Sequence, residues 1–104
     1  MRISILQTDI VWEDKEENLK RLHNKLEELC GKTDIVILPE MFSTGFTMRS
    51  NELAEPVDGK TITTLRSLAK TYGIALVGSY IASDNGHYYI RCFLLTPNNE
   101  SFYY

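Results

Sequence analysis

The sequence predicts an α/β fold with the element order β-α-β-α-β followed by a hairpin. Two segments with helical spacing of apolar residues alternate with short β-branched runs, and the last quarter changes to strand and turn patterns. The second and third of these runs are apolar on both faces, which is typical of strands covered on each side. Strands separated by helices are joined by right-handed crossovers, so the helices are expected to pack on a sheet.

The first strand and the first helix are predicted from local signals. A strand over residues 2–11 begins with an apolar run and turns polar at Gln7. Asp14 and Glu17 have the spacing of a helix-capping box, which predicts a helix after them. Gly31 suits the left-handed position that ends a helix. The apolar stripe of this helix consists of Leu19, Leu22, Leu26 and Leu29.

The middle of the chain contains a second strand, a long loop and a second helix. The apolar run 34–38 is predicted to be a central strand that stops at Pro39, because proline cannot donate a ladder hydrogen bond. No period holds over residues 40–60, and loops of that length are usually functional or mobile. A helix is expected over residues 61–72, followed by a third strand over residues 74–80.

The last quarter predicts a turn at residues 83–86, a strand from Tyr88 to Thr96, and a partner strand that starts at Ser101. The chain then ends on three aromatic residues, 102–104. We expect a truncated domain whose missing part would cover these rings. The alternative is a hairpin that ends here, with its rings packed back on the sheet.

Length and charge exclude several classes of protein. The 104 residues are expected to form a single domain over residues 1–104. The net charge is −3 and the basic residues are scattered, which excludes the basic patch of a nucleic-acid-binding protein. No apolar run has the ~18–20 residues of a membrane span, and the start lacks a secretory signal. We therefore expect a cytoplasmic protein with no nucleic-acid or membrane partner.

Cysteines and histidines are weak candidates for chemistry. Cys30 and Cys92 are too few for a disulfide scaffold or a zinc site, and we expect both to be reduced, buried thiols. His23 and His87 are expected on the surface. The glycines form no phosphate-cradling pattern, so no cofactor and no metal is predicted.

Glu40 is the candidate catalytic residue, because it follows a buried strand and begins the long loop. Ligands of open α/β sheets bind beyond the carboxyl ends of strands. Burial among Met and Phe side chains would raise the pKa of this carboxyl, as a general base requires. A structural role, such as capping a helix or pairing with an arginine, is the alternative. The candidate wall of a substrate pocket is formed by Met41, Phe42 and Phe46.

The segment 35–42, IVILPEMF, followed by STGF at residues 43–46, resembles the first catalytic motif of the nitrilase, or carbon-nitrogen hydrolase, superfamily. The resemblance is nearest to the bacterial ω-amidase-like branch and extends over essentially the whole chain. It departs at Ile90, where the family usually has asparagine. Further similar segments are 7–9, Asn18, 78–80 and 93–98.

The resemblance implies an α-β-β-α sandwich, of which this chain is the N-terminal part, and hydrolysis of an amide or nitrile by a Glu, Lys and Cys set. It implies that Glu40 is the general base, that the substrate is a small ω-amide of a 2-oxo acid such as 2-oxoglutaramate, and that the protein is a homodimer. The family's lysine and cysteine motifs would follow Tyr104, so the isolated chain is expected to be inactive. No role transfers to Lys60, Lys70, Cys30 or Cys92.

Two other classes of function remain open from the residues. The chain could be a non-catalytic α/β interaction module that associates through its aromatic hairpin edge. It could also be a small ligand-binding domain that uses the loop 40–48, although no motif supports this. Half of a sandwich leaves one face of a sheet uncovered, so we expect marginal stability for the chain alone.

Overall fold

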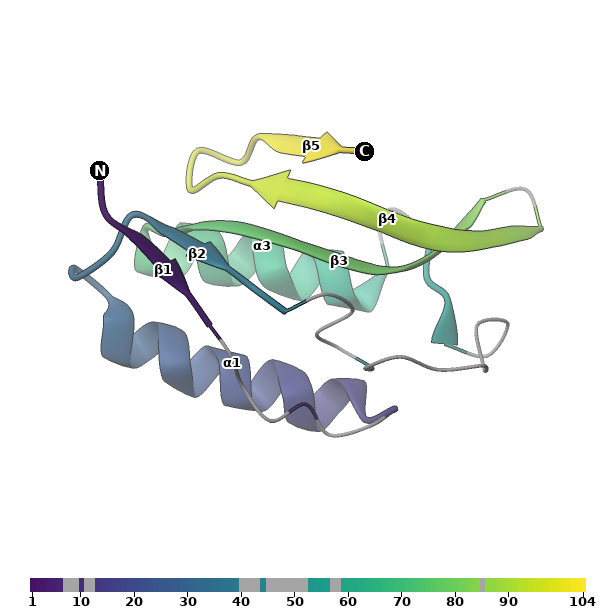
Figure 1. Cartoon of the computed structure of the whole chain (residues 1–104), viewed down its shortest axis with the longest axis horizontal. Coiled ribbons are helices and arrows are strands. Elements are labelled where there is room, and N and C mark those ends of the chain that lie inside the picture. The colour runs from purple at the N-terminus through teal and green to yellow at the C-terminus, as the bar shows by residue number, and fades with distance from the viewer. Residues whose placement is uncertain (7–9, 11–12, 40–43, 45–52, 57–58, 85) are drawn as a thin grey trace.

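The structure is a computed structural model, and it describes residues 1–6, 10, 13–39, 44, 53–56, 59–84 and 86–104 (Figure 1). Its element order confirms the predicted β-α-β-α-β arrangement followed by a hairpin. The elements are β1 (Ile3–Ile5), α1 (Lys15–Leu29), β2 (Ile35–Ile37), α3 (Lys60–Tyr72), β3 (Ala75–Asp84), β4 (His87–Leu95) and β5 (Ser101–Tyr103).

The strands form one sheet in the order β1-β2-β3-β4-β5. β1 pairs with β2 and β2 with β3 in parallel, whereas β4 is antiparallel to both β3 and β5. β1, β2, β3 and β5 therefore all run in one direction, and their carboxyl ends lie at one edge of the sheet. This edge is called the carboxyl edge below.

β3 is longer than the sequence predicts, since it continues past Tyr80 to Asp84. The added residues include Ile81 and Ala82, which are buried. They pair with β4 until the chain turns near Gly86, whose φ of 80° favours glycine. β3 and β4 are thus themselves a long hairpin, and β5 adds a second, short one.

Both helices begin and end where local chemistry predicts. The Asp14 carboxylate accepts a hydrogen bond from the backbone N–H of Glu17 at 3.1 Å, which caps α1. Gly31 follows α1 with a φ of 78°, and Gly73 ends α3 with a φ of 65°. Such positive φ angles cost little for glycine alone. Gly73 is therefore the C-cap of α3, whereas α1 ends at Leu29 with Cys30 as its C-cap, one residue before Gly31.

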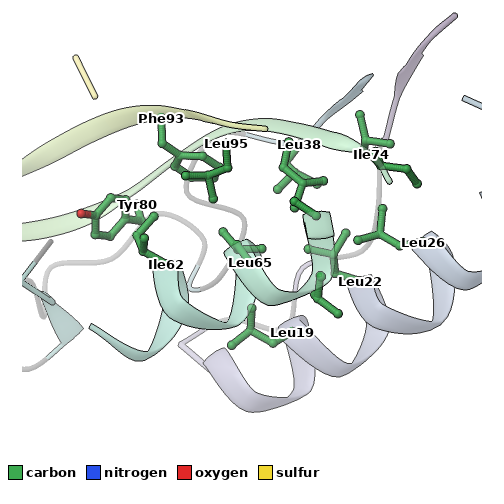
Figure 2. Packing of buried hydrophobic residues seen from close by; sticks show 14 of the residues in the cluster. Leu19, Leu22, Leu26, Leu38, Ile62, Leu65, Ile74, Tyr80, Phe93 and Leu95 are labelled. Carbon is green, nitrogen blue, oxygen red and sulfur yellow. The ribbon is translucent and has the colours of Figure 1, made fainter. Parts of the chain in front are cut away.

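One hydrophobic core lies between the helices and one face of the sheet (Figure 2). Leu26 of α1, Leu65 of α3 and Leu76 of β3 are completely buried in it. The predicted leucine stripe of α1 supplies most of that helix's contribution, although Leu29 is only partly buried. The two helices therefore cover the same face of the sheet.

The opposite face of the sheet is exposed along β1, β4 and β5, and we call it the bare face. Successive strand residues point to opposite faces, and in the middle of this face Ser79 and Ile81 of β3 are buried. Ile5 is 70% exposed, Ile90 46% and Phe102 54%. An apolar sheet face of this kind fits one layer of the sandwich that the resemblance implies.

The aromatic end of the chain divides between the two faces. Tyr103 packs partly against the core, and its hydroxyl accepts a hydrogen bond from Arg66 at 2.7 Å. Phe102 and Tyr104 are exposed, Tyr104 by 98%. Of the three terminal rings, only that of Tyr103 therefore packs back on the sheet, as the alternative prediction had it, and those of Phe102 and Tyr104 do not.

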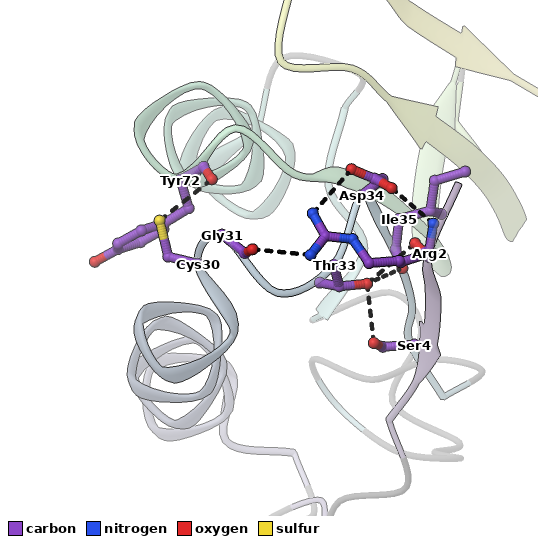
Figure 3. A network of polar contacts seen from close by, with 8 residues as sticks. All are labelled: Arg2, Ser4, Cys30, Gly31, Thr33, Asp34, Ile35 and Tyr72. Carbon is purple, nitrogen blue, oxygen red and sulfur yellow. Dashed lines mark hydrogen bonds and ion pairs between the residues drawn. The ribbon is translucent and has the colours of Figure 1, made fainter.

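A polar network joins the amino ends of β1 and β2 (Figure 3). The Arg2 backbone N–H donates to the Asp34 carboxylate at 2.6 Å, which lowers the pKa of that carboxyl. The Arg2 guanidinium donates to the carbonyl of Gly31 at 2.9 Å. Ser4 donates to the Thr33 hydroxyl at 2.9 Å. These contacts set the register of β1 beside β2, at the end of the sheet away from the carboxyl edge.

Within the described residues, neither helix is long and apolar enough to span a membrane.

Candidate functional site

The site predicted from the sequence belongs to the carboxyl edge, where β2 ends. After Ile37, the Leu38 backbone N–H still donates to the Val77 carbonyl at 2.8 Å, and the Leu38 side chain is buried. The chain is therefore held against β3 up to the residue before Pro39. β2 is central in the sheet as predicted, but it is not covered on both sides, since Val36 is buried and Ile35 and Ile37 are only partly buried.

Glu40 and the proposed pocket residues Met41, Phe42 and Phe46 lie outside the described residues, so their roles stay predictions. Thr44, in the same loop, is described and is 1% exposed. Its carbonyl accepts a hydrogen bond from the backbone N–H of Glu13 at 2.6 Å, just before α1. Part of the predicted loop is thus anchored beside the start of α1.

A buried carboxylate, Glu55, organises the carboxyl edge. It accepts hydrogen bonds from the backbone N–H of Thr61 at 2.7 Å and from the Thr61 hydroxyl. Its other contact is an ion pair with Lys15 at 2.7 Å. Because α3 is preceded by Gly59, which offers no side-chain cap, Glu55 satisfies one of the free N–H groups at this helix start, that of Thr61.

The backbone of Glu55 also extends the sheet locally. Its N–H donates to the Ile81 carbonyl at 3.0 Å, and its carbonyl accepts from the Ser83 N–H at 2.8 Å. These bonds form an isolated parallel bridge between Glu55 and Ala82. The loop is therefore tied to β3 beyond the end of β2.

The electrostatics of Glu55 follow from these contacts. Burial by itself raises the pKa of its carboxyl, but the hydrogen bonds from Lys15 and Thr61 outweigh it, and the pKa lies below the ordinary value. Glu55 is consequently an ionised structural anchor rather than a proton acceptor.

The prediction that both thiols are buried is wrong, since Cys30 and Cys92 are free and exposed. Cys30 directly follows the last helical residue, Leu29, and its thiol donates to the Tyr72 carbonyl at 3.6 Å (Figure 3). Cys92 precedes the buried Phe93 on β4, and neighbouring side chains on a strand point to opposite faces of the sheet, so Cys92 lies on the bare face. The two cysteines belong to opposite sides of the sheet.

The histidines are exposed, as predicted. The His23 ring shares a hydrogen bond of 2.7 Å with the Tyr72 hydroxyl, which links α1 to α3. Lys60 forms an exposed ion pair with Glu16 at 3.1 Å. In the part of the chain that the structure describes, no cluster of three His, Cys, Asp or Glu side chains is placed to hold a metal ion.

Two residues of the carboxyl edge were not predicted from the sequence, Glu55 and Arg91. A carboxylate shortly before a glycine that starts a helix is the local signal for Glu55. A single charge among alternating apolar and aromatic residues is the signal for Arg91. Neither signal specifies the partners that other segments supply, which are Lys15 for Glu55 and Tyr103 for Arg91.

Comparison with known proteins places this layered sheet in a family. The carbon-nitrogen hydrolase family model matches residues 2–102. The crystal structure of a CN-hydrolase superfamily protein from Xanthomonas campestris, which has an arsenic adduct in its active site, aligns with a TM-score of 0.93. The two are 35% identical, over 99% of this chain and 39% of that chain.

Two curated relatives extend the comparison. The chain is 34% identical over 95 residues to omega-amidase YafV of Yersinia enterocolitica, covering 91% of this chain and 36% of the relative. It is 33% identical over 82 residues to 2-oxoglutaramate amidase of Bacillus subtilis, covering 77% of this chain and 31% of the relative.

The fold is that of a nitrilase-superfamily α/β layer, as the sequence predicts. The chain belongs to the carbon-nitrogen hydrolase family, whose members are hydrolases. It spans well under half the length of these relatives.

Proposed function

We propose that this chain supplies the general base, Glu40, of a cytoplasmic, homodimeric amidohydrolase. The enzyme cleaves small ω-amides of 2-oxo acids, such as 2-oxoglutaramate, to the acid and ammonia. The observation that carries the proposal is the match of residues 2–102, motif 35–42 included, to the carbon-nitrogen hydrolase family model, together with the identities of 34% and 33% to an omega-amidase and a 2-oxoglutaramate amidase. The carboxyl edge supports it, because the central strand β2, held against β3 up to the buried Leu38, precedes Glu40 in the sequence.

The proposed reaction needs a base because a thiol is mostly protonated at pH 7. Glu40 takes the proton of a cysteine thiol, and the thiolate attacks the amide carbon. A lysine stabilises the oxyanion, and the proton held by Glu40 passes to the leaving nitrogen, so that ammonia departs. Water, deprotonated by Glu40, then cleaves the thioester, and the thiol recovers its proton.

The lysine and the nucleophile of this scheme come from outside the 104 residues in our proposal. Cys30 and Cys92 are exposed and face different sides of the sheet, which supports this. Lys15 is engaged with Glu55, and Lys60 with Glu16. The chain alone is therefore proposed to be one part of a larger domain and to be without turnover.

Substitution of Glu40 tests the proposal in the full-length protein that contains this chain. Glu40→Gln keeps the size of the side chain and removes the base, so ammonia release from 2-oxoglutaramate should fall by about 10²–10⁴-fold. Glu100→Gln, an exposed change in the turn before β5, is the matched control and should retain activity. Near-normal turnover of the Glu40 variant, with both proteins folded by circular dichroism, would refute the role of Glu40.

The exposed rings of Phe102 and Tyr104 favour a second candidate, a non-catalytic module that associates through β5. The two candidates give opposite results in one measurement. The module is supported, and the hydrolase is not, if the natural protein is a stable oligomer of 104-residue chains and releases no ammonia from any ω-amide.

A further inference from the structure

A cavity of about 600 Å³ lies at the carboxyl edge, beside Pro56. Residues of β3, β4 and the end of the chain line it, among them Asp84, Tyr89, Arg91 and Tyr103. Arg91 pairs with Tyr80, which lies farther along β3 than Val77, the partner of the last residue of β2. The cavity is therefore at the same end of the sheet as the segment that leads to Glu40.

Arg91 is held in the cavity by aromatic rings. Its guanidinium carbon lies 5.1 Å from the centre of the Tyr89 ring and 5.9 Å from that of Tyr103. One N–H donates to the Tyr89 hydroxyl, which in turn donates to Asp84 at 3.3 Å. Within the described residues, Arg91 has no carboxylate at ion-pair distance. Its charge is thus positioned without being neutralised.

The buried Tyr80 adjoins Arg91. It is 1% exposed, and within the described residues its hydroxyl meets no acceptor at hydrogen-bond geometry; the group that interacts with it is the Arg91 guanidinium, which is itself a donor. The hydroxyl points away from the aliphatic core (Figure 2). Burial raises the pKa of Tyr80, and the nearby Arg91 guanidinium partly offsets this, so the hydroxyl stays a proton donor at neutral pH. A buried donor without an acceptor costs free energy that a bound acceptor would recover.

A carboxylate is the ligand group that fits this arrangement. The Arg91 guanidinium, which lines the cavity, presents N–H groups in a planar fork that matches two carboxylate oxygens. The Asp84 carboxylate in the cavity wall and the net charge of −3 disfavour ligand groups that carry more negative charge than one carboxylate, such as a phosphate. The aromatic walls suit a short carbon chain.

We propose that this cavity binds the carboxylate of the ω-amide substrate and that Arg91 determines specificity for it. The inference rests on the proposed function and deepens it, since it explains how an ω-amide of a 2-oxo acid is distinguished from a simple amide. Arg91 binds the carboxylate end, while Glu40 acts at the amide end.

Kinetics with two amides test the role of Arg91 in the full-length protein. Arg91→Met should lower kcat/KM for 2-oxoglutaramate by roughly 10–100-fold, the effect of losing a charged hydrogen bond. For butyramide, which has no carboxylate, kcat/KM should change less than about twofold, because this amide does not use the charge. Arg91→Lys should lie between wild type and Arg91→Met. Arg21→Met, on the outer face of α1, is the matched control.

Equal losses for the two amides, or no loss for either, would overturn the proposal while leaving the hydrolase intact. A binding measurement separates this failure from failure of the proposed function. Calorimetry with 2-oxoglutarate, on the inactive Glu40→Gln variant, should show binding that Arg91→Met weakens by a similar factor. If no amide is hydrolysed, this binding still supports the carboxylate site, and its absence refutes it.

Discussion

At the scale of single residues, Glu55 joins three segments that are distant in sequence. Its side chain caps α3 and pairs with Lys15 at the start of α1, while its backbone bridges to β3. A buried charge is tolerated only when it is paired and hydrogen-bonded, and Glu55 has both kinds of partner. Gly59 is required for this approach, because a Cβ there would lie 2.7 Å from the carboxylate.

Removing the charge of Glu55 should destabilise the fold in a pH-dependent way. Glu55→Gln should lower the free energy of unfolding at pH 7 by about 1–3 kcal/mol, since charged hydrogen bonds are lost. The folded-state pKa lies below the ordinary 4.5, so the contribution is complete above that pH and is lost as the pH falls through the lower folded value. Urea unfolding of both proteins from pH 7 to pH 3 measures the difference.

The difference between wild type and Glu55→Gln should therefore narrow below pH 4.5. Glu16→Gln is the matched control, because its ion pair with Lys60 is exposed and should contribute little at any pH. A difference that stays constant over this range would contradict the assigned ionisation of Glu55.

At the scale of elements, β3 brings β2 and β4 into contact through Gly78. The ring of Phe93 on β4 lies over this position, and Leu38 meets it from the end of β2. A Cβ on Gly78 would lie 2.9 Å from the Phe93 ring and 3.2 Å from the Leu38 Cβ. Since Leu38 precedes Pro39 and Glu40, the missing side chain determines how closely the β2 end can approach the core.

Gly78→Ala should therefore lower the free energy of unfolding by about 1–3 kcal/mol, the usual cost of overpacking. Phe93→Leu removes the ring and makes room for the added methyl group. In a double-mutant cycle, the second substitution should relieve part of the first, giving a coupling free energy of about 0.5–3 kcal/mol. Strict additivity of the two effects in chemical denaturation would show that the close contact is not the cause.

At the scale of the whole molecule, the two faces of the sheet differ. α1 and α3 cover most of one face, on which Tyr89 near the start of β4 stays 40% exposed, whereas the bare face exposes Ile3, Ile5 and Ile90. Large exposed apolar patches mark surfaces that another element or partner covers. In the proposed hydrolase, this face is the one against which the second sheet of the sandwich packs.

A charge on the bare face should distinguish the chain alone from the larger hydrolase that we propose contains it. Ile5→Lys should change the free energy of unfolding of the 104-residue chain by less than about 0.5 kcal/mol, because Ile5 is 70% exposed. In the full-length protein it should cost about 2 kcal/mol or more, since the ammonium would be buried without a partner. Asn24→Lys, on the outside of α1, is the control and should leave the free energy of unfolding unchanged in both proteins. If Ile5→Lys lowers that free energy by the same small amount in both, the bare face is not covered.

Much of the fold was predictable because its signals are local. The Asp14 cap, the leucine stripe and Gly31 specify α1 within one stretch of chain, and the structure confirms them. The length of β3 was not predictable, because residues past Tyr80 become strand only by pairing with β4. The exposure of Cys92 was mispredicted for a related reason, since it depends on which face of the sheet the helices cover.

The sequence by itself determined the order of the elements and, through the motif around Glu40, the carbon-nitrogen hydrolase family. Capping, periodicity and motif spacing involve residues close together in the chain, so they can be recognised in the sequence without knowledge of the fold. Only the tertiary structure decided that Glu55 is a buried anchor and that Arg91, opposite Tyr80 on the neighbouring strand, lines a cavity. Their environments include segments far apart in the chain. How deeply these side chains are buried, and which groups they contact, is determined only when those segments pack together.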